Sequence, residues 1–398
     1  MKKRMILSVC LLSCFVAPVS AAEDASGDTI RFSTLFNKTI FQGSSADSLT
    51  RARHKKTFFH RVGAVFTRFF REFSTIDTNY VEPQHYNYTV MLQNTNTYEQ
   101  YTLSSKDGQK IVFAPDPTFR LGPYVGWRWV FLGYTLDLKH ISFKSDHSSK
   151  KEFDLSLYSS MLGIDLYWRQ TGNDYHINRM KGLDDADYSS LRNVPFEGFK
   201  ASIKGLNLYY IFNHRKFSYP AAYSQSTVQR KSAGSMLLGI GYTEHNLKVD
   251  WDELGSILDQ RLGKKENGES RIDPDLKFSE INYFDVSASC GYAYNWVFAK
   301  NWLFNASLSA GLAYNQSNSD TDGSHSHSHL RFKDFSFKNF NLDGIGRFGV
   351  VWNNTKWYAG ASTVIHSYNY KKEQFSTNNW FGSLNIYVGV NFGKKRNQ

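Results

Sequence analysis

Apolar and polar residues alternate one by one over much of the chain, in segments of about ten residues. The clearest segment is Phe284–Phe298, where every even-numbered residue is aromatic, aliphatic, Ala or Cys, and the odd-numbered residues from Asp285 to Asn295 are small or polar. Trp302–Tyr314 and Leu384–Phe392 follow the same pattern. Successive side chains of a strand point to opposite faces, so each segment predicts a strand with one apolar and one polar face. The pattern favours an all-β protein.

The connections between these segments indicate how the strands are joined. Very short links such as Ala299–Asn301 and Asn353–Thr355 alternate with long polar ones such as Asn315–Lys333 and Lys371–Asn379. Short turns at one end and long loops at the other are typical of a transmembrane antiparallel up-and-down β-barrel. We expect about 12 strands, with a range of about 10 to 14. The expected strands are residues 86–94, 99–104, 118–124, 129–138, 153–168, 198–212, 233–244, 285–298, 302–314, 340–352, 357–370 and 383–392.

Aromatic residues support a membrane location for these strands. Trp296 with Trp302, and Trp352 with Trp357, bracket two of the short links, so they would form an aromatic girdle at one depth. The last expected strand ends at Phe392, an aromatic end like those that barrel-assembly machinery reads, although residues 393–398 follow it. The expected partners are therefore outer-membrane lipid and that machinery.

The N-terminal part of the chain has a different composition. A basic head, an apolar stretch and small residues around Ala21 predict a cleaved signal peptide over residues 1–21. Residues 22–56 are polar and read as a flexible arm. Phe and Val then recur at three- and four-residue steps, which predicts a short amphipathic helix over residues 57–75. Residues 80–398 form the expected outer-membrane β-barrel domain, and the predicted location is the outer membrane after export.

Charge and cysteine content narrow the possibilities further. The formal net charge is +11, and removal of the signal, which supplies three positive charges, leaves +8. Because Lys and Arg are scattered through polar loops, we expect contact with anionic headgroups and solvent and no nucleic-acid partner. Signal removal also takes away Cys10 and Cys14, and Cys290 alone cannot form an internal disulfide. An aromatic content of 16% is consistent with a membrane interface.

Several stretches carry a family resemblance. They are Tyr80–Pro83, Thr89–Asn94, Leu121–Trp129, Lys216–Ala222, Ser232–Ser235 and Gly291–Trp296. Through them, the chain from about Phe70 onward resembles DUF4421, an uncharacterised domain of unknown function of Bacteroides-type bacteria. The resemblance implies an outer-membrane location and supplies no activity, substrate or catalytic residue.

No motif in the sequence assigns a catalytic centre or a cofactor. Nucleophile elbows, phosphate-binding loops, dinucleotide fingerprints and metalloprotease helices are all missing from the sequence. The sharpest cluster is His325, His327 and His329, whose imidazoles share one side of an extended segment and could bind a transition metal. A solvated His-rich loop is the alternative interpretation, and it is the commoner one for such short tracts.

Strand parity identifies polar residues expected to face the barrel lumen. These residues could fill and hydrogen-bond a narrow interior, or they could set the selectivity of a pore. They are Asp165, Asn207, Asp285, Asn305 and Arg347. The link Lys216–Tyr223 is unusually apolar for a loop and is expected to fold into the barrel or to dock on the amphipathic helix.

The sequence thus favours an outer-membrane β-barrel with a passive role, either a pore or a structural or binding module of the cell envelope. Two alternatives stay open. An outer-membrane barrel enzyme, a lipid or peptide hydrolase, would gather Ser, His and Asp residues in space, which sequence spacing does not reveal. A soluble periplasmic or surface β-sandwich that binds a ligand would show the same alternation, with its apolar face turned inward. The ligand is not identified by the sequence.

Overall fold

A computed structural model describes residues 75–127, 130–133, 136–137, 151–278, 280–318, 339–371 and 374–395. The expected signal peptide, polar arm and amphipathic helix lie outside these residues, except for residue 75. The three loop histidines His325, His327 and His329 also lie outside them. No helix in the described part of the chain is long and apolar enough to cross a membrane.

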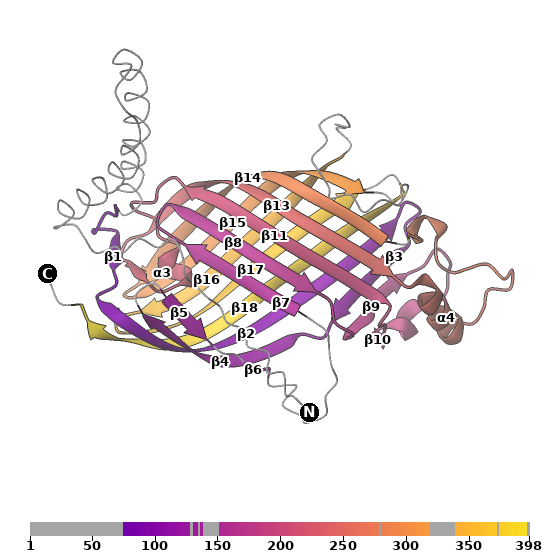
Figure 1. Cartoon of the computed structure of the whole chain (residues 1–398), viewed down its shortest axis with the longest axis horizontal. Helices are drawn as coiled ribbons and strands as arrows, with labels where there is room; N and C mark the ends of the chain where they lie inside the picture. Colours follow the sequence, from indigo (N-terminus) through magenta and orange to yellow (C-terminus); the bar gives the residue numbers. More distant parts are fainter. Residues whose placement is uncertain are drawn as a thin grey trace, which may run out of the picture.

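One antiparallel sheet of 16 strands dominates the described structure (Figure 1). Consecutive strands pair as neighbours in register, as β14 with β15 and β15 with β16 do. The long strands are β2 (Tyr86–Ser105), β4 (Thr118–Trp127), β7 (Lys151–Tyr158), β8 (Leu162–Gln170), β11 (Phe199–Ile211), β13 (Ala233–Val249), β14 (Glu280–Ala299), β15 (Trp302–Asn318), β16 (Phe340–Asn353), β17 (Trp357–Lys371) and β18 (Phe375–Lys394).

The sheet curls so that its last long strand, β18, returns to pair with its first, β2. β18 runs antiparallel to β2 from Phe375 opposite Ser105 to Lys394 opposite Tyr86. β4 then continues the sheet from β2 and pairs with β5 (Val130–Gly133) and β6 (Leu136–Asp137). Within the described residues β7 pairs only with β8, and β5 and β6 pair only with β4. Side chains of β8 contact those of β16 and β17, which are several strands away around the sheet. The inner face therefore encloses a common interior, and the expected antiparallel β-barrel is confirmed.

The two ends of the barrel differ in structure. At one end, called the plug end, β1 (Val81–Pro83) pairs with β12 (Thr227–Gln229) beside the short helix α3 (Pro220–Tyr223) (Figure 1). The other end, called the α4 end, carries the remaining short elements (Figure 1). They are β3 (Lys110–Pro115), β9 (Tyr175–Lys181), η1 (Tyr188–Leu191), β10 (Val194–Pro195), α4 (Trp251–Leu262) and η2 (Pro274–Leu276).

Local sequence explains why α4 forms between the expected strands 233–244 and 285–298. The side chain of Asp250 accepts a hydrogen bond from the Glu253 amide at 3.0 Å and so caps the helix. Leu254 and Leu258, one helical turn apart, are buried against the barrel end. The helix ends at Gly263, whose φ of 76° lies in the left-handed region that glycine tolerates.

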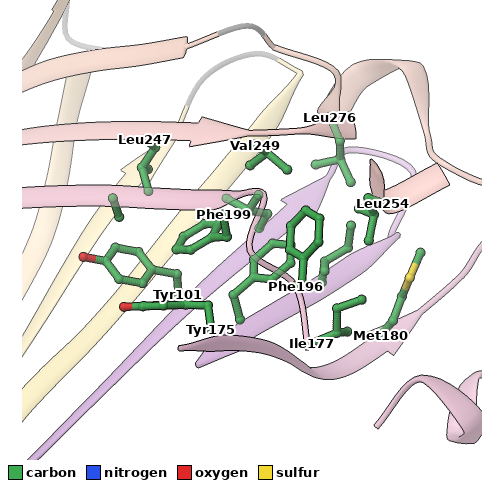
Figure 2. Packing of buried hydrophobic residues seen from close by; sticks show 14 of the residues in the cluster. Tyr101, Tyr175, Ile177, Met180, Phe196, Phe199, Leu247, Val249, Leu254 and Leu276 are labelled. Carbon is green, nitrogen blue, oxygen red and sulfur yellow. The ribbon is translucent and has the colours of Figure 1, made fainter. Parts of the chain in front are cut away.

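The main apolar core lies at the α4 end, inside the barrel mouth (Figure 2). Phe113 of β3 stacks on Phe199 of β11 with ring centroids 4.6 Å apart, and Tyr101 of β2 packs on Phe199 at 5.2 Å. Figure 2 shows Leu254 of α4 and Leu276 of η2 beside these aromatic rings. The elements α4 and η2 thus share one core with the barrel wall, and apolar side chains fill this end of the barrel.

The strand bounds correct three expectations. Residues 86–94 and 99–104 belong to the single strand β2, because the polar residues between them stay in the ladder with β4 and β18. Residues 153–168 are two strands, β7 and β8, joined by a turn in which the Leu162 amide donates to the Ser159 hydroxyl at 2.9 Å. The stretch between the expected strands 153–168 and 198–212, where no strand was expected, contains β9, which pairs with β3. The longest path through the sheet has 13 strands, which is within the expected range.

Candidate functional site in the barrel interior

The five residues expected to face the lumen all lie on the inner face of the barrel. Each is at most 7% exposed, and together they come from five strands, β8, β11, β14, β15 and β16. They are Asp165, Asn207, Asp285, Asn305 and Arg347. The structure brings Asp165 and Arg347 into direct contact, whereas each of the other three bonds to a different neighbour.

Arg347 and Asp165 form an ion pair across the interior. The Arg347 Nη2 donates to Asp165 Oδ2, and the Ser156 hydroxyl donates to the other carboxylate oxygen at 2.6 Å. The guanidinium also lies over the Tyr209 ring, with 4.7 Å from Cζ to the ring centroid. Both partners are almost fully buried, so each charge is compensated by the other instead of by water.

A second polar group lies nearer the α4 end. His245 Nε2 is 3.4 Å from Asp285 Oδ2, and the Thr243 hydroxyl donates to the same oxygen at 3.1 Å. The imidazole is stacked on Tyr283, with ring centroids 4.4 Å apart. A hydroxyl, an imidazole and a carboxylate in contact resemble a hydrolytic triad in composition. All three side chains are buried between strands, however, so a substrate has no access to the hydroxyl.

Aromatic side chains fill the level between these two polar groups. The hydroxyls of Tyr167 and Tyr368 are hydrogen-bonded to each other across the barrel, and the Asn207 amide donates to Tyr368 at 3.3 Å. The His366 ring is stacked on Phe381 with centroids 4.9 Å apart. The interior at this level is therefore packed with side chains from β8, β11, β17 and β18.

The apolar link between β11 and β13 closes the other end from within. We call residues Lys216–Gln225 the plug, because most of its side chains are buried inside the barrel. The Tyr219 ring packs on Tyr158 of β7 and Tyr209 of β11, with centroids 5.6 and 5.9 Å apart. Of the two expected positions for this run, the structure places it inside the barrel.

Hydrogen bonds fix the plug to the opposite wall. Tyr219 and Tyr223 bond through their hydroxyls to Ser307 and Asn305 of β15, both at 2.6 Å. The Asn295 amide of β14 donates to the Ser218 carbonyl at 2.8 Å. Farther round, the Gln225 amide donates to the Tyr387 hydroxyl of β18 at 2.9 Å. The plug thus contacts strands on both sides of the barrel and spans its interior.

A partly buried ion pair joins the small sheet β1–β12 to the barrel rim. Arg230, just after β12, pairs through Nε with Glu82 of β1 and donates from Nη1 to the Asn301 side chain at 2.9 Å. Partial burial favours the neutral form of Glu82, but the hydrogen bonds from Arg230 and His85 outweigh it and lower the pKa of that carboxyl. The carboxylate is therefore charged near neutral pH and ties β1, β12 and a barrel turn together.

The outer face of the barrel carries the apolar residues. Among the exposed large hydrophobic side chains of the described chain, all but Leu183 and Phe212 lie in strands of the sheet. Many of them are aliphatic, for example Ile240, Leu308 and Leu342. Several exposed aromatic residues lie toward the ends of the strands: Tyr88, Trp296, Trp302, Trp357 and Phe392 toward the plug end, and Trp168, Tyr242 and Trp380 toward the α4 end. Tyr292, which is also exposed, lies opposite Leu308 in the middle of the sheet.

A surface hollow of about 430 Å³ opens at the α4 end, between β9 and η1. Basic side chains of Arg179, Lys181 and Arg192 line it together with Asp184 and Tyr188. The Tyr188 hydroxyl donates to Asp184 at 2.6 Å, which lowers the pKa of the Asp184 carboxyl. Partial burial and the same contact raise the pKa of Tyr188 to about 12. The charges that line it are already paired in part.

Sequence reasoning missed several residues of the interior. Arg169, assigned to a loop, lies on the inner face of β8, where its Nη2 contacts Asp154 at 2.6 Å. It has the parity of Asp165 and Tyr167, so extending that strand by one residue would have found it. Asn295 and Ser307 share the inward parity of Asp285 and Asn305, but their role as plug anchors depends on where the plug lies.

The chain matches the family profile described as "Domain of unknown function (DUF4421)" over residues 75–392. No curated protein matches it. Among solved structures, it is similar to the outer membrane protease OmpT from Escherichia coli, at 8% identity over 77% of this chain and 97% of that chain, with a TM-score of 0.30.

Two further solved structures are similar to the same extent. They are the toluene transporter TodX from Pseudomonas putida, at 8% identity over 78% of this chain and 91% of that chain with a TM-score of 0.22, and the transport unit of the autotransporter AIDA-I from Escherichia coli, at 10% identity over 77% and 90% with a TM-score of 0.28. The barrel arrangement of this chain rests on the strand pairing described above.

Proposed function

This chain belongs to the DUF4421 family, whose description assigns no activity, and we propose that it is an outer-membrane β-barrel with a closed interior and a structural or binding role at the cell envelope. The proposal rests on the distribution of polar and apolar side chains, which is the reverse of that in a soluble protein. Charged residues such as Arg347 and Asp165 are enclosed, whereas Leu308, Ile240 and Leu342 are exposed. A soluble β-sandwich requires the opposite arrangement, with its apolar face inside.

The dimensions of the outer face fit a bilayer. On β18, the exposed Trp380 and Phe392 are twelve positions apart, with the exposed Ile386 and Val388 between them. A rise of about 3.4 Å per residue and a strand tilt of about 45° separate the two aromatic rings by about 29 Å along the barrel axis. An apolar band about 25 Å tall between aromatic girdles is characteristic of outer-membrane barrels. An apolar surface of this extent exposed to water would favour aggregation.

The closed interior favours a structural or binding role over a passive pore. Ions that enter from the plug end meet the plug, then the Arg347–Asp165 pair, then the packed rings of Tyr167, His366 and Phe381. The apolar core and α4 close the opposite mouth (Figure 2). A conducting path needs continuous water, and dry aromatic constrictions oppose it.

The geometry favours a non-catalytic role. The one grouping of hydroxyl, imidazole and carboxylate noted in the described interior, Thr243 with His245 and Asp285, is buried, and none of the three lines the hollow beside η1. An outer-membrane hydrolase needs its nucleophile within reach of a substrate.

Fractionation and conductance together test the proposal. We expect the protein in the outer-membrane fraction after an alkaline wash, with altered gel mobility on heating, because strands that satisfy one another's backbone hydrogen bonds resist detergent. In planar bilayers we expect no steady conductance steps. Recovery in the soluble periplasmic fraction would contradict the membrane location, and reproducible steps from the native protein would contradict the closed interior.

Thiol labelling tests the plug itself. In a Cys290→Ser background, Ser307→Cys places a thiol beneath Tyr219, and we expect it to resist a membrane-impermeant reagent. Replacing residues 217–223 with Gly and Ser should make this thiol reactive. The matched control replaces residues 264–270, an exposed loop of equal length at the α4 end, and should leave the thiol protected. Equal labelling in all three proteins would show that the plug does not cover Ser307.

A further inference from the structure

Three carboxylates meet at the α4 end although two separate loops supply them. Asp107 lies in the turn between β2 and β3, and Asp273 and Asp275 lie at the start of η2 in the link after α4. One carboxylate oxygen from each of the three residues lies within 4.8 Å of the others. None of the residues used in the proposed function belongs to this cluster.

Local structure holds the two loops together. Gly108, at a φ of 100°, makes the β2–β3 turn tight enough to present Asp107. The next residue, Gln109, is fully buried; its amide donates to the Arg271 carbonyl at 2.7 Å and its oxygen accepts from the Asp273 amide at 2.9 Å. Leu276 is buried in the core beneath η2 (Figure 2). The contacts of Gln109 and the burial of Leu276 therefore fix the position of the Asp273 backbone.

Asp273 carries an oxygen that the described protein leaves unused. The residue is 4% exposed; its Oδ1 accepts from the Asp275 amide at 3.0 Å, while Oδ2 is buried without a hydrogen-bond partner in the described residues. No Lys, Arg or His of the described chain lies within ion-pair distance of the three carboxylates. The guanidinium of Arg271, the nearest base in sequence, pairs with Asp184 instead. Carboxylates this close repel one another unless a cation compensates them.

We infer that these three carboxylates bind a divalent cation of the calcium type. A hard cation with oxygen ligands matches a donor set of Asp side chains, and Ca²⁺ accepts six to eight such ligands in flexible geometry, with water completing the shell. Mg²⁺ demands a stricter octahedral arrangement, so a site shared by two loops favours Ca²⁺. The bound ion joins the β2–β3 turn to the loop that leads from α4 into β14.

Calorimetry on the full chain, purified in detergent and stripped with a chelator, tests the site. Titration with CaCl₂ should show one site with a Kd on the order of 10⁻⁴ to 10⁻³ M, as in extracellular modules. Asp107→Asn should weaken binding about tenfold or more, because it removes one of three ligand charges. Asp107 is exposed, so this variant keeps the fold. The matched control, Glu266→Gln, removes an exposed charge from the link after α4, which carries Asp273 and Asp275, and should bind normally.

Limited proteolysis gives an independent measurement. Trypsin cleavage at Lys264 and Lys265, in the loop that the ion would restrain, should slow when Ca²⁺ is added to the native protein and should not change in Asp107→Asn. The inference is overturned if no binding heat appears up to 10⁻² M Ca²⁺, or if Asp107→Asn and Glu266→Gln weaken binding equally, which would indicate diffuse attraction to surface charge. It is also overturned if Mg²⁺ binds as tightly as Ca²⁺. None of these outcomes depends on whether the barrel conducts or where it resides.

Discussion

Substitution of Leu308 by Arg distinguishes a lipid-facing barrel surface from a water-facing one. Leu308 is 63% exposed on β15, six positions from Trp302 of the girdle at the plug end. At about 3.4 Å per residue and a tilt of about 45°, it lies about 14 Å from that girdle along the axis. This is close to the midplane of an apolar band about 25 Å tall.

Water and lipid around Leu308 predict different losses of stability for this substitution. In water, replacing an exposed Leu changes the free energy of unfolding by no more than about 0.5 kcal/mol. At a bilayer midplane, an Arg on the lipid face costs about 2–4 kcal/mol because the guanidinium loses its hydration. We therefore expect Leu308→Arg to lower the stability of the barrel in lipid vesicles by about 2–4 kcal/mol.

Denaturant titration of the folded protein in vesicles measures this difference. Leu183→Arg is the matched control, since Leu183 is 51% exposed but lies in the link after β9 at the α4 end, outside the strands. Leu183→Arg should change the free energy of unfolding by no more than about 0.5 kcal/mol. Leu308→Ala separates loss of the apolar side chain from gain of the charge. If Leu308→Arg and Leu183→Arg have equal small effects, the outer face does not contact lipid and the membrane proposal is wrong.

Three further predictions concern the interior and the rim. Arg347→Met should lower the free energy of unfolding by about 3–5 kcal/mol, measured by denaturant titration, because it leaves a buried carboxylate without its partner. Gly205→Ala should cost about 1–3 kcal/mol in the same titration, since its new Cβ would lie 2.0 Å from the Tyr167 ring, whereas Gly344→Ala meets nothing within 4 Å and should be neutral. The pKa of Glu82 is lowered in the folded protein, so its stabilising contribution is present above its ordinary value of 4.5 and is lost as the pH falls through the lowered value. Denaturant titrations at several pH values across this acid range should show a smaller loss of stability in Glu82→Gln than in the native protein. An equal loss would show that this ion pair does not stabilise the fold.

Much of the barrel wall could be predicted from the sequence. The alternation within Phe284–Phe298 sets which residues share a face, because a strand's backbone turns successive side chains to opposite sides whatever the strand pairs with. The inward positions of Asp285 and Arg347 follow from the same local geometry. Where turn-like or polar residues interrupted the pattern, as in the middle of β2, the bounds were wrong because pairing with β4 and β18 held them in the ladder.

Only the tertiary structure decided which inner residues meet. Arg347 and Asp165 are 182 positions apart, and the plug residue Tyr219 bonds to Ser307, 88 positions away. Such contacts depend on the curl of the sheet and on the order of its strands, which no local period encodes. The apolar character of Lys216–Tyr223 was visible in the sequence, but its position inside the barrel was not. The Asp107–Asp273 cluster likewise exists because two loops meet at the α4 end, and the spacing of those residues along the chain carries no trace of it.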